Sequence, residues 1–214
     1  MRGFTILELL VVLAITGIVT AIAVPNYQKI TQNLRIAGDL RDLNGIVAQA
    51  KMQAAANFTH ARARANLAPN TFQLEIWSKT GGAGGAGCWQ TVGDAANPCT
   101  VAASSVQPLS SGVTFGFDQV AAPPPNTQAA IAQAGLCGNG AAGTVSNTAT
   151  IANTACIEFN SRGIPINAAG NPSGNGALYV NNGNAVYGLT VGATGYALNW
   201  SSADAASNTS WYRR

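Results

Sequence analysis

The first 28 residues form an almost unbroken apolar stretch. No charged residue lies from Leu9 through Gln28, a run of 20 residues. An α-helix rises about 1.5 Å per residue, so this run is long enough to cross a hydrocarbon core of about 30 Å. The pattern therefore predicts a membrane-spanning helix over residues 4–28, preceded by a short basic leader at residues 1–3.

The pattern becomes amphipathic beyond Pro25. Apolar residues recur there at steps of four and three, which places them on one stripe of a helix. They are Ile36, Leu40, Leu43, Val47, Ala50 and Ala54. Arg35 and Asp39 have the spacing of a helical ion pair. Helicity is expected to fade between Ala56 and Pro69, so residues 29–65 are expected to hold the second half of a helix of about 50 residues and a linker.

Gly17 and Pro25 are expected to weaken this helix. Proline has no N–H to donate to the carbonyl of Ala21, and glycine has no side chain to limit its backbone. We therefore predict a helix break in this region.

Residues 66–214 predict a β-rich head. Residues 72–77 alternate apolar and polar side chains with period two. Similar short patterns cover residues 89–92, 113–117, 156–159, 177–180, 185–191 and 196–200, with turns rich in Gly, Pro and Asn between them. Residues 123–154 lack such a pattern and predict a long loop. The fold class is therefore α+β, with a long helix packed on antiparallel sheet.

The cysteines predict disulfides. The chain has four, at Cys88, Cys99, Cys137 and Cys156, and none forms a C-x-x-C pair. With a single histidine in the chain, a metal site is not expected. An even number of cysteines in a membrane-anchored chain favours two disulfides in an oxidising compartment. Three pairings are possible. Cys88–Cys99 and Cys137–Cys156 are favoured because each closes a local loop.

Charge and motif spacing argue against nucleic acid as a partner and against catalysis. The net charge is +3, and residues 71–214 hold four cations against five anions, which is a weak basis for binding phosphates. His60 has no orienting partner motif and is expected at the surface. Gly82-x-Gly84-x-x-Gly87 matches a dinucleotide fingerprint, but a strand-like segment follows it where that motif needs a helix. We expect no enzyme activity, cofactor or metal.

The N-terminus resembles the class III signal of type IV pilins and type II secretion pseudopilins. The matching residues are Gly3, Phe4, Thr5, Leu7, Glu8, Leu9 and Pro25. A secretory signal peptide fits poorly, because an acid lies inside the apolar run and no small-residue cleavage site follows it. The resemblance implies that a prepilin peptidase cuts after Gly3 and methylates Phe4. A carboxylate at membrane depth needs a partner, so Glu8 is expected to pair with the N-terminal amine of a neighbouring copy.

Parts of the head resemble GspH/FimT-type minor pilins and pseudopilins, at residues 111–115, 157–165 and 187–195. This resemblance implies a pilin fold whose head has two small sheets. Some FimT-like proteins bind DNA through a G-R-x-R motif after the last glycine. Here that position reads Gly195-Tyr196-Ala197-Leu198, without either arginine. Arg213 and Arg214 remain weak candidates for contact with single strands, although a frayed terminus is the preferred interpretation.

The resemblance leads to a functional expectation. The chain is expected to be a single-pass inner-membrane protein with its head in the periplasm, which then joins a pilus or pseudopilus with other pilins. The favoured role is a minor pilin near the tip of a type IV pilus that helps to initiate assembly. The alternatives are a type II secretion pseudopilin, a DNA-binding minor pilin and, less favoured, the major filament subunit.

Overall fold

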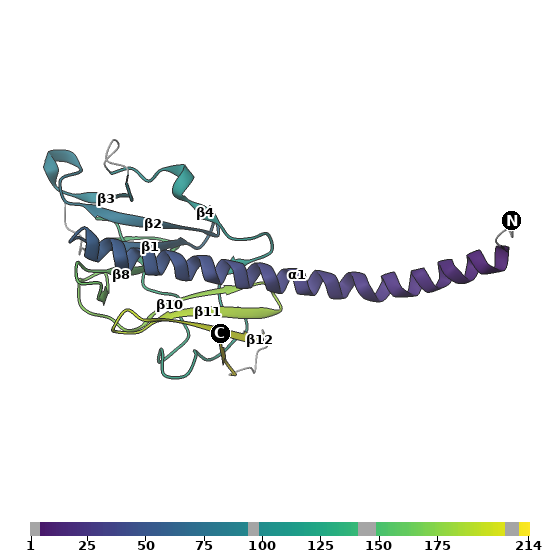
Figure 1. Cartoon of the computed structure of the whole chain (residues 1–214). Coiled ribbons are helices and arrows are strands. Elements are labelled where there is room, and N and C mark those ends of the chain that lie inside the picture. Colours follow the sequence, from purple (N-terminus) through teal and green to yellow (C-terminus); the bar gives the residue numbers. More distant parts are fainter. Residues whose placement is uncertain (1–4, 94–98, 141–148, 204–209) are drawn as a thin grey trace.

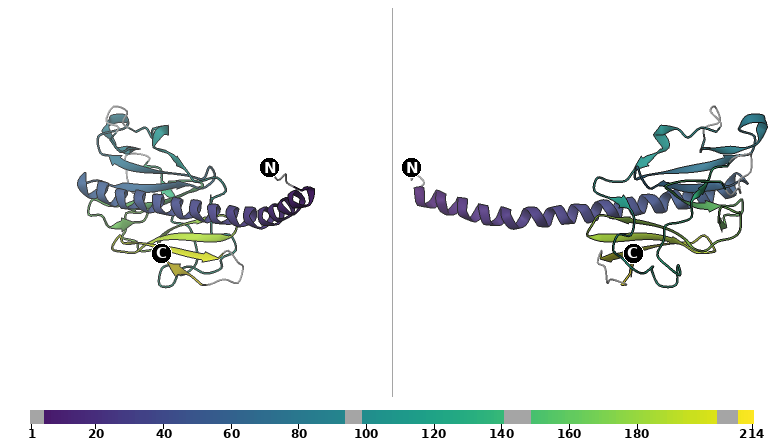
Figure 2. Two further views of the ribbon diagram at one scale, coloured as in Figure 1. Left: turned by 45° about the vertical axis from the view of Figure 1, so that its right-hand side comes forward. Right: turned by 180° about the vertical axis from the view of Figure 1, so that it is seen from behind.

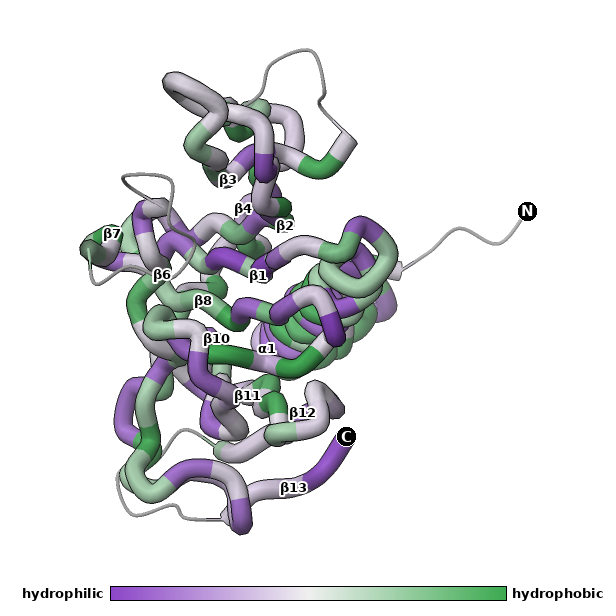
Figure 3. The backbone as a smooth tube through the Cα atoms, turned by 90° about the vertical axis from the view of Figure 1, so that its left-hand side faces the viewer, coloured by the Kyte–Doolittle hydropathy of each residue, from purple (hydrophilic) through white to green (hydrophobic). Residues whose placement is uncertain are grey.

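The computed structural model describes residues 5–93, 99–140, 149–203 and 210–214. One long helix, α1 (Ile6–Ala56), projects from a β-rich head and ends inside it (Figure 1). Its second half lies between two antiparallel sheets, which Figure 3 shows on opposite sides of the helix. The predicted α+β pilin fold is thus confirmed.

Helix α1 holds the head together through the predicted apolar stripe. The helix has 51 residues, and all six stripe residues predicted from the sequence are buried, together with Ile46. They pack against strands of both sheets. Full burial of one Leu or Ile side chain contributes about 1.5–3 kcal/mol, so this stripe is a main source of the head's stability.

The helix ends in a hydrogen-bonded turn after Asn57. The Thr59 N–H donates to the Ala54 carbonyl at 3.1 Å, and the Phe58 N–H donates to the Ala55 carbonyl at 3.4 Å. This pair of bonds is the Schellman arrangement, in which the first of the two donor residues has a left-handed backbone. That residue is Phe58, with a φ of 48°. A left-handed backbone costs a residue other than glycine about 1–2 kcal/mol.

The first sheet is built around a strand that the sequence analysis missed. Its order is β3-β2-β1-β8-β9, with β4 also paired to β2. The strands are β1 (Ala61–Asn66), β2 (Thr71–Ser78), β3 (Cys88–Thr91), β4 (Gln107–Pro108), β8 (Thr154–Phe159) and β9 (Pro165–Ile166). The linker prediction for residues up to 65 is therefore wrong at β1. Its alanines face the core and its arginines face away, and alanine is a weak strand signal.

The second sheet has the order β13-β12-β11-β10-β5. Its strands are β5 (Thr114–Phe115), β10 (Gly176–Asn181), β11 (Ala185–Val191), β12 (Ala197–Ala203) and β13 (Tyr212–Arg213). A further two-stranded sheet joins β6 (Cys137–Gly138) to β7 (Thr150–Ile151), inside the region predicted as a long loop. Two short 3-10 turns, Ala83–Gly85 and Ala103–Ser105, complete the described elements.

A buried carboxylate ties α1 to the loop that leads into β5. Asp39 is 5% exposed, and it accepts from the Ser110 hydroxyl at 2.8 Å and from the Ser110 N–H at 3.1 Å. Arg35 instead donates to the Ser111 carbonyl at 3.4 Å. The predicted Arg35–Asp39 ion pair is therefore wrong, because the loop supplies a partner for each side chain. Burial raises the pKa of Asp39 above its ordinary value of 3.8, partly opposed by the Ser110 hydrogen bonds.

We predict that Asp39→Asn changes how stability depends on pH. A raised pKa means that the folded protein holds this proton more tightly than the unfolded chain does. Ionisation of Asp39 therefore favours unfolding, and the free energy of unfolding falls as the pH rises above 3.8. An asparagine can still accept from Ser110 but does not ionise.

The measurement is thermal unfolding of the full chain in detergent, between about pH 3.5 and 7, a range that spans the ordinary aspartate pKa. The variant should gain stability relative to the wild type as the pH rises. If the difference in melting temperature between the variant and the wild type stayed the same at every pH, this explanation of Asp39 would be wrong.

Candidate assembly site

The first half of α1 presents an apolar surface that the head does not cover. Its large apolar side chains are all at least 50% exposed. They are Ile6, Leu7, Leu9, Leu10, Val11, Val12, Leu13, Ile15, Ile18, Val19, Ile22, Val24, Tyr27, Ile30 and Leu34. Within the described residues, α1 is also the helix whose length and hydropathy suit a membrane span. A surface of this size requires lipid or other apolar helices around it.

Glu8 lies in the first turn of this apolar half. Thr5 caps the helix, and its hydroxyl accepts from the Glu8 N–H at 3.3 Å. The Glu8 carboxylate itself has no hydrogen bond or ion pair with the described residues. A helix N-terminus favours an acid, but that effect alone does not neutralise a carboxylate in lipid. The geometry therefore leaves Glu8 available to a partner outside this chain.

The helix runs without interruption through Gly17 and Pro25, so the predicted break is absent from this subunit. Figure 2 shows a smooth curve along the projecting half. Thr20 donates to the carbonyls of Thr16 at 2.9 Å and Gly17 at 3.0 Å. Proline removes one backbone bond, but the bonds on either side remain and keep the helix continuous. The resemblance to type IV pilins implies that the region from Gly17 to Pro25 can stretch when a filament assembles, and this stays a prediction.

Comparison with known proteins adds one finding to this geometry. Residues 1–24 match the family described as the prokaryotic N-terminal methylation motif. No curated protein and no solved structure matches the chain. The motif, the long apolar helix and the α+β head are together consistent with a type IV pilin-like protein.

In type IV pilins generally, this motif implies processing by a prepilin peptidase and assembly with other pilins. For this pilin-like chain, the single apolar helix fits a membrane anchor. Gly3 and Phe4, the residues predicted for cleavage and methylation, lie outside the described residues. Their roles stay predictions that rest on the motif.

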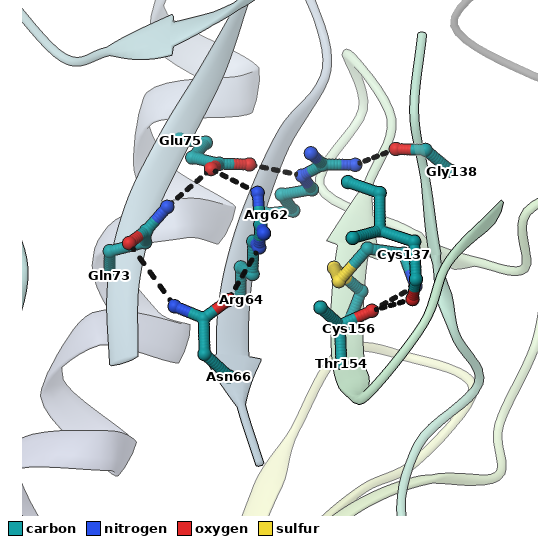
Figure 4. The surroundings of a disulfide bond; sticks show 10 residues. Arg62, Arg64, Asn66, Gln73, Glu75, Cys137, Gly138, Thr154 and Cys156 are labelled. Carbon is teal, nitrogen blue, oxygen red and sulfur yellow. Dashed lines mark hydrogen bonds and ion pairs between the residues drawn. A yellow bond between two sulfur atoms is a disulfide. The ribbon is translucent and has the colours of Figure 1, made fainter. Parts of the chain in front are cut away.

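The pilin-like head contains both favoured disulfides. Cys88 is bonded to Cys99 and Cys137 to Cys156, with Cα–Cα distances of 5.2 Å and 5.0 Å. The first closes the loop that follows β3. The second ties β6 to β8 and holds the β6 segment against the outer face of the first sheet (Figure 4).

A buried charge cluster under that segment is the feature that sequence reasoning missed. Arg62 and Glu75 are 1% and 0% exposed, and Arg62 Nε lies 2.6 Å from Glu75 Oε2. Glu75 Oε1 also accepts from Arg64 at 3.2 Å and from Gln73 at 2.5 Å. The guanidinium of Arg62 lies 3.8 Å from the ring centre of Trp89. Figure 4 shows how Arg62 and Arg64 from β1 converge with Gln73 and Glu75 from β2.

The segment that covers the cluster is bonded to it directly. Arg62 Nη1 donates to the Gly138 carbonyl at 2.6 Å, next to the Cys137–Cys156 disulfide. Burial lowers the pKa of Arg62, and the nearby Glu75 opposes that shift. The sequence held a signal for this cluster, because the pairs Arg62/Arg64 and Gln73/Glu75 each have strand spacing. Such a pattern is normally read as a solvated face.

His60 is half-buried, whereas the sequence placed it at the surface. Its Nδ1 lies 2.9 Å from Glu158 Oε1, and its side chain is 26% exposed. The glycine motif at residues 82–87 forms a 3-10 turn that β3 follows, so it lacks the helix that a phosphate site of that kind needs. Among the described residues, no group of His, Cys, Asp or Glu is arranged to hold a metal ion.

The C-terminal residues are paired with the second sheet, so the preferred interpretation as a frayed end is wrong. Trp211 Nε1 donates to the Ala122 carbonyl at 2.8 Å. Arg214 donates from its backbone N–H to the Asn199 carbonyl at 2.9 Å and from Nε to Ser201 at 2.8 Å. Arg213 is exposed in β13. Contact of Arg213 and Arg214 with single-stranded nucleic acid stays a weak prediction.

We predict that Glu75→Gln destabilises the full chain by about 3–5 kcal/mol, because it leaves Arg62 buried without a counter-charge. Arg64→Gln is the matched control. The Arg64 side chain is 21% exposed, so its removal should cost less than about 1 kcal/mol. Denaturant unfolding of each variant in detergent measures the two losses in the free energy of unfolding.

A double replacement sharpens this test. Arg62→Met combined with Glu75→Leu removes both charges, and it should regain most of the stability that Glu75→Gln loses. Equal losses for Glu75→Gln and Arg64→Gln would show that the buried pair does not support the first sheet.

Proposed function

We propose that this chain is a minor pilin of a type IV pilus, incorporated near the tip, where it helps to initiate assembly. The observation that carries the proposal is the exposed apolar half of α1 with the unpartnered Glu8 in its first turn. A soluble protein has no use for such a surface, whereas a bundle of identical or similar helices would cover it.

Assembly follows from the geometry of the helix. In the inner membrane, lipid surrounds the apolar half of α1. On entry into the filament, neighbouring helices replace the lipid at little hydrophobic cost, since both environments are apolar. The attraction between the Glu8 carboxylate and the N-terminal amine of a neighbour is strong in this low-dielectric region. That pairing sets the register between helices.

The head supports a minor role more than a major one. Residues 71–214 carry four cations and five anions, so head-to-head contacts of one copy with the next have few charges to use. Arg62, Arg64 and Glu75 are already paired within the subunit. The resemblance of the head to GspH/FimT-type minor pilins supports the same role. We propose that the protein acts by assembly and not as an enzyme.

The disulfides support a location outside the cytoplasm. Both cross-links lie in the head, and disulfides persist in oxidising compartments such as the bacterial periplasm. We therefore place the head in the periplasm while α1 crosses the inner membrane once. After assembly, the head would lie at the cell surface in a pilus.

The proposal is tested by deleting the gene and quantifying the chain in sheared filaments of the complemented strain. A minor pilin near the tip predicts few surface pili in the deletion strain and an amount of this chain far below that of the major subunit. Normal piliation with impaired protein secretion would instead identify a type II secretion pseudopilin. An amount equal to the main filament mass would identify a major subunit.

We predict that Glu8→Ala blocks incorporation and leaves the membrane pool intact. The neighbour's amine would then be buried without a counter-charge, a loss of about 3–5 kcal/mol. We therefore expect at least a tenfold drop in filament-bound chain, at roughly 1.4 kcal/mol per tenfold. Quantitative immunoblotting of sheared filaments against membranes measures it.

Asp42→Ala is the matched control, because Asp42 is an exposed carboxylate on α1 beyond the apolar half. It should leave incorporation unchanged. Normal incorporation of Glu8→Ala would contradict the pairing proposed for Glu8.

A further inference from the structure

A polar pocket lies beside α1, where the helix leaves the head next to the turn between β10 and β11 (Figure 1). Its volume is about 290 Å³. In that turn, Asn184 donates from Nδ2 to Gln32 Oε1 at 3.2 Å, which fixes the second sheet against the helix. None of the described residues that line the pocket has a carboxylate side chain. The residues that matter for binding are Asn33, Tyr187, Ser201, Tyr212 and Arg214.

Arg214 is held so that part of its guanidinium stays free. Its backbone N–H donates to the Asn199 carbonyl at 2.9 Å, and its Nε donates to the Ser201 hydroxyl at 2.8 Å. The two terminal nitrogens of the guanidinium have no hydrogen-bond or ion-pair partner in the part of the chain that the structure describes. An arginine fixed in this way presents a planar set of donors, which matches the oxygens of a phosphate group.

The hydroxyl of Tyr187 is a second free donor at the same pocket. Tyr187 is 8% exposed, and its side chain belongs to the apolar core. The hydroxyl has no hydrogen-bond partner among the described residues, although polar groups at buried positions are usually bonded. Tyr187 lies opposite Ser201 on the neighbouring strand, and Ser201 holds Arg214. The pocket therefore offers a buried hydroxyl and a guanidinium to the same anion.

The position of the pocket along α1 indicates where this anion comes from. Asn33 lies five residues beyond Gln28, the end of the charge-free run, which is about 7.5 Å at the helical rise per residue. The headgroup layer on each side of a bilayer is roughly 5–8 Å thick. With α1 in a membrane, the pocket thus opens at the level of the lipid headgroups. Tyr212 is 65% exposed there, and tyrosine is enriched at this depth.

We propose that this pocket binds the phosphate group of an anionic phospholipid while the subunit is anchored in the membrane. The inference rests on the membrane anchor of the proposed function, but not on the subunit's place in a filament. Arg214 binds the phosphate oxygens, and the Tyr187 hydroxyl donates to one of them. Lys29, one helical turn before Asn33, and Arg213 are exposed and add attraction to an anionic surface. Entry into a filament carries the pocket away from the headgroups, so the lipid binds the membrane pool alone.

Photo-crosslinking of the full chain in lipid nanodiscs tests the site. One set of discs contains phosphatidylcholine alone, and the other contains equal parts of phosphatidylcholine and phosphatidylglycerol. Benzoyl-phenylalanine replaces Tyr212, which lines the pocket. Tyr196 is the matched control, because it is 61% exposed and follows the turn between β11 and β12 that contacts Lys51, near the far end of α1. Position 13, in the apolar half of α1, is the anchor control.

We expect phospholipid adducts at position 212 that are roughly fivefold or more as abundant in the discs with phosphatidylglycerol, and none at position 196. No adduct at position 212, or equal adducts there in both kinds of disc, would overturn the proposal and leave the proposed function standing. Absence of lipid adducts at position 13 would overturn the membrane anchor and the proposed function with it.

Competition distinguishes the lipid from other phosphates. Inorganic phosphate should not remove the adduct at position 212 any better than sodium chloride of equal ionic strength does. Its selective loss with inorganic phosphate would identify a site for free phosphate. Selective loss with a single-stranded oligonucleotide would identify a nucleic-acid site, and either result would overturn the lipid proposal.

Substitution of Arg214 separates binding from a structural role. In the discs with phosphatidylglycerol, Arg214→Gln should lower the adduct yield at position 212 by about fivefold, the effect of one cation near an anionic surface. Arg214→Lys keeps the charge and should retain most of the yield. Arg162→Gln is the matched control, because Arg162 is exposed between β8 and β9, and it should change nothing. An Arg214→Gln chain with the yield of the wild type would show that the pocket does not bind the lipid.

Discussion

One helix in this protein has to satisfy two different surroundings. The second half of α1 buries a single apolar stripe between two sheets, while the first half exposes apolar side chains on every side. Because the helix is continuous, the head and the apolar half behave as one rod. In this subunit the helix therefore sets the distance between the head and the surroundings of the apolar half. Under the proposed function, those surroundings are lipid in the membrane and other helices in a filament.

The stability of the head depends on the segment that covers the polar outer face of the first sheet. The inner face of the first sheet packs on α1, but its outer face carries Arg62 and Glu75, which are as deeply buried as the apolar core. The β6 segment covers this pair, and its Gly138 carbonyl accepts a hydrogen bond from Arg62. The Cys137–Cys156 disulfide holds the segment in place. The disulfide and the ion pair thus support each other. A buried charge of this kind is tolerated only when its hydrogen bonds are complete.

The sequence predicted those features that depend on local patterns. The extent of α1, its buried stripe, most of the longer strands and both disulfides follow from periodicity and from short loops. Several of the errors share a cause, which is competition from residues far away in the chain. Asp39 bonds Ser110 instead of Arg35, and the arginines of β1 are buried because a distant segment covers them. The paired C-terminus likewise depends on β12 and on Ala122, which no local pattern near Arg213 reveals.

In the candidate site, too, the sequence identified some functional features and missed others. Glu8 was identified because a carboxylate inside an apolar run is informative by itself. The Arg62–Glu75 pair was not identified, because charged residues at strand spacing become unusual only when their burial is known. At Pro25 the sequence predicted a feature that is absent. Proline suggested a helix break, but the neighbouring helical hydrogen bonds keep α1 continuous.

The central claim is that α1 is the assembly helix of a processed filament subunit. Mass spectrometry of the N-terminal peptide of this chain, taken from sheared filaments, tests it most directly. The account predicts a peptide that begins at Phe4 and carries an N-methyl group. A filament-bound chain that still begins at Met1, or a chain that never enters filaments in its processed form, would contradict the account.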